Sequence, residues 1–292
     1  MSFEDLPSLP PLLQPGADDY ARRVSMASKE AMRSTCCALD LPYGDHYWQK
    51  VDIYMPPGGT GPWPVLCYLH GGAWANGCKE WMGFMAPGLV TTPLVFVSIS
   101  YRLAPDARMP LIASDCADAV AWVYRNIESF GGSPQQMFIG GHSAGGHLAA
   151  LLALRQDLLA PRGVPTPLFK ACFPTSARFD LRPRLPASRS DQHLQARVLD
   201  SAESAWEWSP LRWAEGNTTP FLVTWGEEDF PDLVTQGTEF VQALRQQPGR
   251  VDQIVLASES HFTANEESGR PESRWRREAT AWIQTYGNGS QA

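Results

Sequence analysis

Short apolar segments alternate along most of this chain with longer segments of helical periodicity. Six of the short segments have the length and composition of buried strands: Trp63–Leu69, Leu94–Tyr101, Met137–Gly140, Leu168–Phe173, Phe221–Trp225 and Val251–Ala257. The helical segments between and after them include residues 112–129, 144–154, 231–246 and 272–286. Neighbouring parallel strands need a long crossover, which is usually a helix. The alternation therefore predicts an α/β fold with a mostly parallel central sheet flanked by helices.

Two regions depart from this alternation. Residues 1–45 contain several prolines and, from Ala17 to Ala38, one or two helix-like segments, so we expect a helical or irregular extension before a main domain over 46–292. Gln49 to Met55 then alternates like an edge strand. Residues 175–219 separate two predicted strands by more than a plain crossover needs. We predict a cap-like insertion there, and a helical excursion packed on the side of the sheet remains an alternative.

Charge and composition exclude several classes of protein. The 292 residues carry 31 acidic and 24 basic side chains, a net charge of −7, whereas nucleic-acid and anionic-membrane binders normally present a basic face. Hydrophobic residues make up 43% of the chain, which excludes intrinsic disorder. The longest apolar stretches span about 10 residues, too few to cross a bilayer, and the N-terminus has no signal-peptide pattern. We expect a globular protein with a small-molecule substrate; a homodimer stays open.

The cysteines indicate the compartment. None of the six lies in a C-x-x-C pair or near a histidine at the spacing of zinc ligands. Reduced thiols in a cytoplasmic protein are the favoured interpretation, with a disulfide framework and a metal site as alternatives. We expect neither a metal nor an organic cofactor.

A glycine-rich turn follows the apolar segment at residues 137–140. Gly141-His142-Ser143-Ala144-Gly145 is a G-x-S-x-G sequence between a predicted strand and a helix of small residues. A nucleophilic serine needs such a sharp turn so that its hydroxyl stands clear of the sheet, and the start of the following helix favours developing negative charge. The alternative is a glycine-rich turn with an incidental serine. We interpret Ser143 as a nucleophile.

Chain order then limits the base and the acid. On a sheet of this type the order is nucleophile, acid, histidine, and only His193 and His261 follow Ser143. His261 comes after the last predicted strand, at the edge where ligands gather, so it is the candidate general base; a surface histidine is the alternative. The acid should follow the preceding strand, where Asp229 is the candidate and Glu228 and Asp232 compete.

A second glycine pair follows the strand at residues 63–69. Acyl transfer builds negative charge on a carbonyl oxygen, and backbone N–H groups must point at it. The glycines let the loop approach a substrate, so we expect oxyanion donors at Gly72 and Ala73, with the N–H of Ala144 beside the nucleophile. His70 would then brace the loop. A simple strand-terminating turn is the alternative.

These motifs carry a family resemblance. His70-Gly71-Gly72-x-Trp74, Tyr101-Arg102-Leu103-Ala104-Pro105 and Gly141-His142-Ser143-Ala144-Gly145-Gly146-His147 resemble the α/β-hydrolase superfamily. Over about residues 43–285 the chain is most similar to its kynurenine formamidase (arylformamidase) branch, near the hormone-sensitive-lipase-like esterases. Those esterases usually have a third glycine where this chain has Ala73-Trp74, and they favour Asp where it has His142. In both places this chain resembles the formamidases. Small carbohydrate-acyl esterases share these features.

The resemblance and the aromatic content suggest a substrate. Trp74 and Phe262 should flank the reacting carbonyl, Trp81 follows the oxyanion loop, and Trp206 and Trp208 could supply a lid; each tryptophan could equally be core. An aromatic wall suits a planar leaving group such as an aniline or phenol. The arginines of the insertion could meet a substrate carboxylate, although a solvated face is favoured: Arg178, Arg182, Arg184 and Arg189.

We therefore expect a serine hydrolase of the carboxylesterase or arylformamidase type. It would cleave a small formyl- or acetyl-type ester or amide with an aromatic leaving group. A carboxylesterase acting on another metabolite or xenobiotic is the alternative. A binding protein on a hydrolase scaffold is a third hypothesis, disfavoured because the candidate nucleophile, base, acid and oxyanion glycines are all present.

Overall fold

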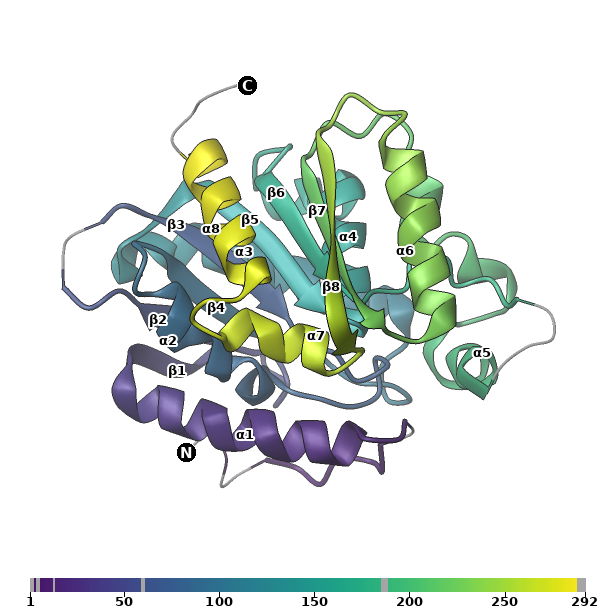
Figure 1. Ribbon diagram of the computed structural model, residues 1–292, viewed down its shortest axis with the longest axis horizontal. Coiled ribbons are helices and arrows are strands. Elements are labelled where there is room, and N and C mark those ends of the chain that lie inside the picture. Colours follow the sequence, from purple (N-terminus) through teal and green to yellow (C-terminus); the bar gives the residue numbers. More distant parts are fainter. Residues whose placement is uncertain (1–2, 4–5, 13, 59–60, 185–188, 288–292) are drawn as a thin grey trace.

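The computed structural model describes residues 3, 6–12, 14–58, 61–184 and 189–287 (Figure 1). Across these residues one eight-stranded sheet runs in the order β1-β2-β4-β3-β5-β6-β7-β8. β2 pairs antiparallel with β1 and β4, and all other pairs are parallel. The strands are β1 (Cys36–Pro42), β2 (Lys50–Met55), β3 (Trp63–Leu69), β4 (Val95–Ile99), β5 (Gly132–His142), β6 (Phe169–Thr175), β7 (Phe221–Glu228) and β8 (Val251–Ser260).

Helices cover both faces of this sheet. They are α1 (Ala17–Ser34), α2 (Ala86–Leu89), α3 (Met109–Asn126), α4 (Ala144–Leu154), α5 (Arg189–His193), α6 (Pro231–Leu244), α7 (Thr263–Glu266) and α8 (Arg274–Gly287). Buried residues of α3, α4 and α6 pack on one face, and those of α1, α2 and α8 on the other. Along β3 the side chains alternate between the two cores, Cys67 with the first and Tyr68 with the second. This architecture confirms the predicted α/β-hydrolase fold.

The N-terminal region differs from the expectation. The predicted helix from Ala17 ends at Ser34, because Thr35 is extended (φ −122°, ψ 143°) and the following residues form β1. The sheet therefore begins inside the region expected to be an extension. β1 also makes β2 an inner strand, hydrogen-bonded on both sides, so the prediction of an edge strand there was wrong.

The predicted insertion follows β6. It holds α5, a π-helical turn at Leu194–Val198 and 3-10 turns at Glu203–Ala205 and Pro210–Trp213. In Figure 1 α5 lies beside α6, toward the end of the sheet to which the parallel strands point. Among the described helices none is both long and apolar enough to cross a membrane.

Candidate active site

Ser143 occupies the sharp turn between β5 and α4. Its backbone is left-handed, with φ 55° and ψ −118°, and its N–H donates to the carbonyl of Thr175 at 2.9 Å. The first turn of α4 packs tightly against β3: a Cβ on Gly145 would collide with the carbonyl of Leu69. Glycine at this position therefore lets the helix start directly behind the serine.

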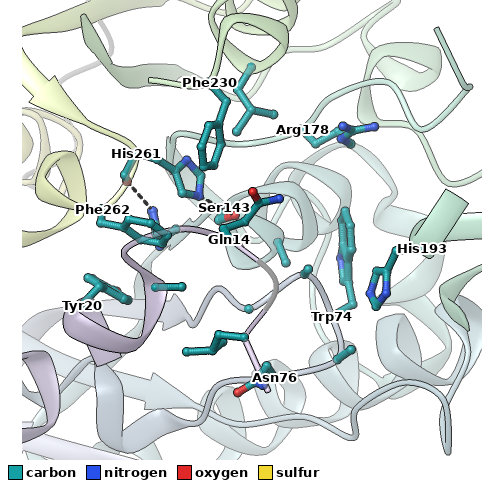
Figure 2. Close-up of a pocket in the computed structure, with 18 of the residues that line it drawn as sticks. Gln14, Tyr20, Trp74, Asn76, Ser143, Arg178, His193, Phe230, His261 and Phe262 are labelled. Atoms are coloured by element: carbon teal, nitrogen blue, oxygen red, sulfur yellow. Dashed lines mark hydrogen bonds between the residues drawn. The ribbon is translucent and has the colours of Figure 1, made fainter. Parts of the chain in front are cut away.

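Two later loops bring His261 and Asp229 to this serine. His261 follows β8 and Asp229 follows β7. His261 Nδ1 lies 2.8 Å from Asp229 Oδ1, and its Nε2 lies 3.1 Å from Ser143 Oγ (Figure 2). With the proton on Nδ1, Nε2 can accept the serine hydroxyl hydrogen. Of the competing carboxylates, Glu228 is exposed and Asp232 pairs with Arg178 and Arg184.

The environment of Asp229 keeps it ionised. The side chain is buried, and burial alone would raise the pKa of its carboxyl group. The hydrogen bond from His261 and the nearby imidazole outweigh burial and lower the pKa of Asp229 below its usual value. The backbone N–H of Phe230 also donates to Oδ1 at 2.7 Å. An ionised Asp229 fixes the imidazole tautomer that leaves Nε2 free to accept.

The loop after β3 lies in a left-handed conformation over three residues. The φ angles are 119° at Gly72, 52° at Ala73 and 59° at Trp74. His70 braces the start of the loop: its ring stacks on Tyr101 at 4.3 Å and donates to the carbonyl of Gly71 at 2.7 Å. Burial lowers the pKa of His70 to about 4, so the ring is neutral. Gly72, Ala73 and Trp74 of this loop line the same cavity as Ser143.

His147 fixes the far end of this loop. The Trp74 indole N–H donates to His147 Nδ1 at 3.3 Å, and His147 Nε2 donates to the carbonyl of Trp208 at 2.7 Å. Burial lowers the pKa of His147 to about 4, which matches this neutral tautomer. One imidazole therefore joins the loop after β3, α4 and the insertion.

A cavity of about 1310 Å³ opens above Ser143. Figure 2 shows side chains from distant parts of the chain converging on it. Its lining includes Gly72, Ala73, Ala144 and the predicted aromatic residues Trp74, Trp81 and Phe262. The turn that carries Ser143, its hydrogen-bonded partner His261 and the loop after β3 thus share one cavity, an arrangement capable of acyl transfer.

Comparison with known proteins gives this arrangement a family. The prolyl oligopeptidase family matches residues 111–290, from α3 beyond the end of α8. The chain belongs to the prolyl oligopeptidase family. The BD-FAE family also matches, over residues 51–167. The protein is accordingly an α/β-hydrolase-fold serine hydrolase.

Individual relatives of this hydrolase have several activities. It is 29% identical over 260 residues to a kynurenine formamidase of Danio rerio, covering 86% of this chain and 85% of the relative. It is 32% identical over 220 residues to esterase LipC of Mycobacterium tuberculosis, covering 70% and 54%. A solved structure from Silicibacter sp. TM1040, described as a candidate thioesterase, aligns with a TM-score of 0.78 and 25% identity over 92% of this chain and 94% of that one.

Two predicted pocket residues lie elsewhere in this hydrolase. Trp206 and Trp208 do not contribute to the lining of the cavity. The guanidinium of Arg182 lies 3.9 Å from the centre of the Trp206 ring, and that of Arg155 lies 5.7 Å from that of Trp208. Both indoles therefore pack against arginines, whose planar cations favour aromatic faces. The prediction that Trp206 and Trp208 form a lid over the cavity was wrong.

The insertion lines the cavity with polar side chains instead. Arg178, expected on a solvated face, is mostly buried and pairs with Asp191 and Asp232 at 2.7 and 3.0 Å. Arg184 and His193 lie on the same wall. The side chain of Arg189 lies outside the described part of the structure. A charged wall therefore replaces the predicted tryptophan lid.

The N-terminal wall of the cavity was not predicted from the sequence. Pro10, Gln14 and Tyr20 line the cavity, and Asn76 of the loop after β3 donates through its amide to the carbonyl of Pro10. Buried Tyr20 lies on α1, one turn before buried Val24, and the only local signal was this helical spacing of apolar residues. Such spacing predicts a buried face, and it does not reveal which part of the molecule covers that face.

Proposed function

We propose that Ser143, His261 and Asp229 form a catalytic triad for two-step acyl transfer. Ser143 Oγ attacks the substrate carbonyl while His261 Nε2 takes its proton. The tetrahedral intermediate collapses, and His261 gives that proton to the leaving oxygen or nitrogen. Water, deprotonated by His261, then attacks the acyl-serine and releases the acid. The 2.8 and 3.1 Å contacts of His261 support these roles.

The N–H groups of Gly72, Ala73 and Ala144 would stabilise the intermediate. Each donor of this kind contributes about 3–4 kcal/mol in the transition state when it is held in place beforehand. The left-handed backbone of Gly72 and Ala73, and the position of Ala144 at the start of α4, support this assignment. The negative oxygen would also lie at a helix N-terminus.

The substrate we propose is a small formyl- or acetyl-type ester or amide with an aromatic leaving group. One observation carries this choice: aromatic rings surround the group that must protonate the leaving atom. The ring of Phe230 lies 4.6 Å from the His261 imidazole and that of Phe262 lies 5.1 Å from it, centre to centre. A planar apolar leaving group gains area burial and stacking there. Relatives named kynurenine formamidase support the same class.

A broader carboxylesterase activity is the second candidate. The cavity, about 1310 Å³, exceeds the range of about 300–1,000 Å³ usual for small-ligand sites. That room favours an ester bulkier than a formanilide. Relatives named as esterases are consistent with this alternative.

In either case we propose a cytoplasmic enzyme, supported by six cysteines that are all free thiols.

Steady-state kinetics distinguish the two candidates. We would compare kcat/KM for N-formylkynurenine and p-nitrophenyl acetate on one preparation, with Ser143→Ala as the blank. A formamide value above about 10⁴ M⁻¹s⁻¹ supports an arylformamidase. Strong ester turnover with negligible formamide turnover supports the carboxylesterase.

Covalent labelling tests the nucleophile independently of substrate. A fluorophosphonate should modify Ser143 in the wild-type enzyme and leave folded Ser143→Ala unlabelled. Wild-type turnover in Ser143→Ala would refute the site assignment.

A further inference from the structure

Tyr20 is an aromatic side chain that lines the candidate active site, although it lies outside the sequence motifs at residues 70–74, 101–105 and 141–147. It lies on the first turn of α1, more than 120 residues before Ser143 and 240 before His261 in sequence. The residue is only 3% exposed, yet it lines the cavity above the serine. We infer that Tyr20 is a specificity-determining residue, whose ring forms the wall that selects an aromatic leaving group. This inference rests on the proposed function and names a residue that sets its substrate class.

The ring contacts place Tyr20 on the leaving-group side. It stacks on Phe262 with centroids 5.1 Å apart and planes at 27°, and it lies 5.8 Å from the ring of His142. Phe262 and His142 in turn both pack against the imidazole of His261, at 5.1 and 4.8 Å. Because the leaving atom must approach His261 Nε2 to receive its proton, the group that it carries lies among these rings. Figure 2 shows Tyr20 and Phe262 together on the His261 side of Ser143, away from Trp74.

A buried hydrogen-bond chain holds the Tyr20 ring in place. Its hydroxyl accepts from Asn265 Nδ2 at 2.7 Å, and Asn265 Oδ1 accepts from the Tyr68 hydroxyl at 3.1 Å. Asn265 lies on α7, four residues after His261. Tyr68 is the second-to-last residue of β3. The ring is therefore tied to the loop of the base and to the strand of the oxyanion loop. A ring fixed in this way forms part of the cavity wall without an ordering cost at each binding event.

The helix that carries Tyr20 is itself firmly docked. Ala17, Tyr20, Val24 and Ala31 form a buried stripe along α1, and Trp81 meets the Tyr20 ring edge-on at 6.1 Å. Phe262 and Trp81 line the cavity beside it, so this part of the wall is aromatic. Planar apolar groups fit such a boundary by stacking, whereas flexible alkyl groups gain only area burial.

The test measures leaving-group selectivity. The ratio of kcat/KM for phenyl acetate to that for trifluoroethyl acetate holds the acyl group constant, and comparing this ratio between variants cancels the intrinsic reactivity of the two esters. Tyr20→Leu, which removes the ring but keeps an apolar side chain, should lower the ratio about 3- to 10-fold. Tyr20→Phe keeps the ring and should keep the ratio within about twofold of wild type.

Val24→Ala is the matched control. Val24 is buried on the same face of α1, one turn further on, and it lies outside the cavity lining. This variant should weaken the docking of α1 and leave the ratio unchanged. An unchanged ratio in Tyr20→Leu, or an equal fall in Val24→Ala, would show that Tyr20 only anchors the helix and would overturn the inference.

A binding measurement separates this inference from the proposed function. The dissociation constant of 1-naphthol, followed by protein fluorescence, should rise about 3- to 10-fold in Tyr20→Leu and stay constant in Val24→Ala. Ester and formamide turnover that is absent, or that survives Ser143→Ala, would refute the proposed function alone. Constant naphthol affinity in Tyr20→Leu would refute the role of Tyr20 even if the enzyme is a serine esterase.

Discussion

Ser143 has a backbone conformation that its neighbours must impose. Its φ of 55° is left-handed, and such a conformation costs a residue other than glycine about 1–3 kcal/mol. The Thr175 carbonyl accepts its N–H, and the first turn of α4 is held against β3 at Gly145. The hydroxyl reaches His261 only while both contacts persist. The strain at the serine is therefore sustained by packing at a glycine two residues away.

Gly145→Ala tests this dependence. The new methyl group would meet the Leu69 carbonyl, so α4 must shift; we expect a loss of about 1–3 kcal/mol of unfolding free energy and a fall in kcat of about 100-fold. Urea unfolding and ester kinetics measure the two effects. Gly287→Ala is the control, because its Cβ would lie 3.4 Å from Pro64 Cγ, in ordinary contact. Equal behaviour of the two variants would contradict this account.

Three elements of the active site meet at one imidazole. His147 belongs to α4, accepts from the indole of Trp74 on the loop after β3, and donates to the carbonyl of Trp208 in the insertion. Trp74 and His147 are buried and Trp208 is half-buried, so water cannot readily replace a lost hydrogen-bond partner. The conformation of the loop after β3, which carries the proposed oxyanion donors, thus depends on an element distant from it in sequence.

His147→Phe should separate these elements. The Trp74 N–H and the Trp208 carbonyl would lose their partner, which predicts a loss of about 2–5 kcal/mol of unfolding free energy. We also expect kcat to fall about 100-fold with KM nearly unchanged, since the proposed role of the loop is to stabilise the transition state. His147→Gln retains a donor and an acceptor and should lose much less. If the two variants lose kcat equally, the hydrogen bonds of His147 do not position the loop.

At the scale of the whole molecule, buried histidines limit stability in acid. Burial lowers the pKa values of His70 and His147 to about 4 and that of His142 to about 3, against about 6.5 in the unfolded chain. Below pH 6.5 the unfolded state binds these protons and the folded state does not, so stability falls as pH decreases. Burial raises the pKa of Asp52 to about 6, which opposes this effect by one proton.

The net difference of about two protons predicts a measurable slope. Each proton contributes about 1.4 kcal/mol per pH unit, so the unfolding free energy should fall by about 2–3 kcal/mol between pH 6 and pH 5. Urea unfolding at pH 7, 6 and 5 measures it, and His147→Gln should reduce the slope by about one proton. Equal stability at pH 7 and pH 5 would mean that these histidines do not stay neutral in the folded protein.

Local sequence patterns identified the sheet and the order of the candidate triad. The confirmed fold followed from short apolar segments separated by helical ones, because burial on both faces of a parallel sheet leaves such a pattern in any single strand. Ser143, Asp229 and His261 could be named because each follows a strand, and the ends of parallel strands meet at one edge. The prediction that the helix continues to Ala38 was wrong, because only the pairing with β2 shows that Cys36–Pro42 is a strand.

The sequence by itself determined the glycine-rich turn at Ser143, the glycine loop after β3 and the strands that present them, since these depend on sterics within a few residues. Only the tertiary structure decided which side chains surround the serine. It brought Tyr20 to the cavity, although the sequence placed that residue only in a helix-like segment, and it placed Trp206 under an arginine, although the sequence suggested a lid there. The physical reason is that a buried side chain needs apolar cover without specifying its source, so the partner is chosen by how distant elements pack.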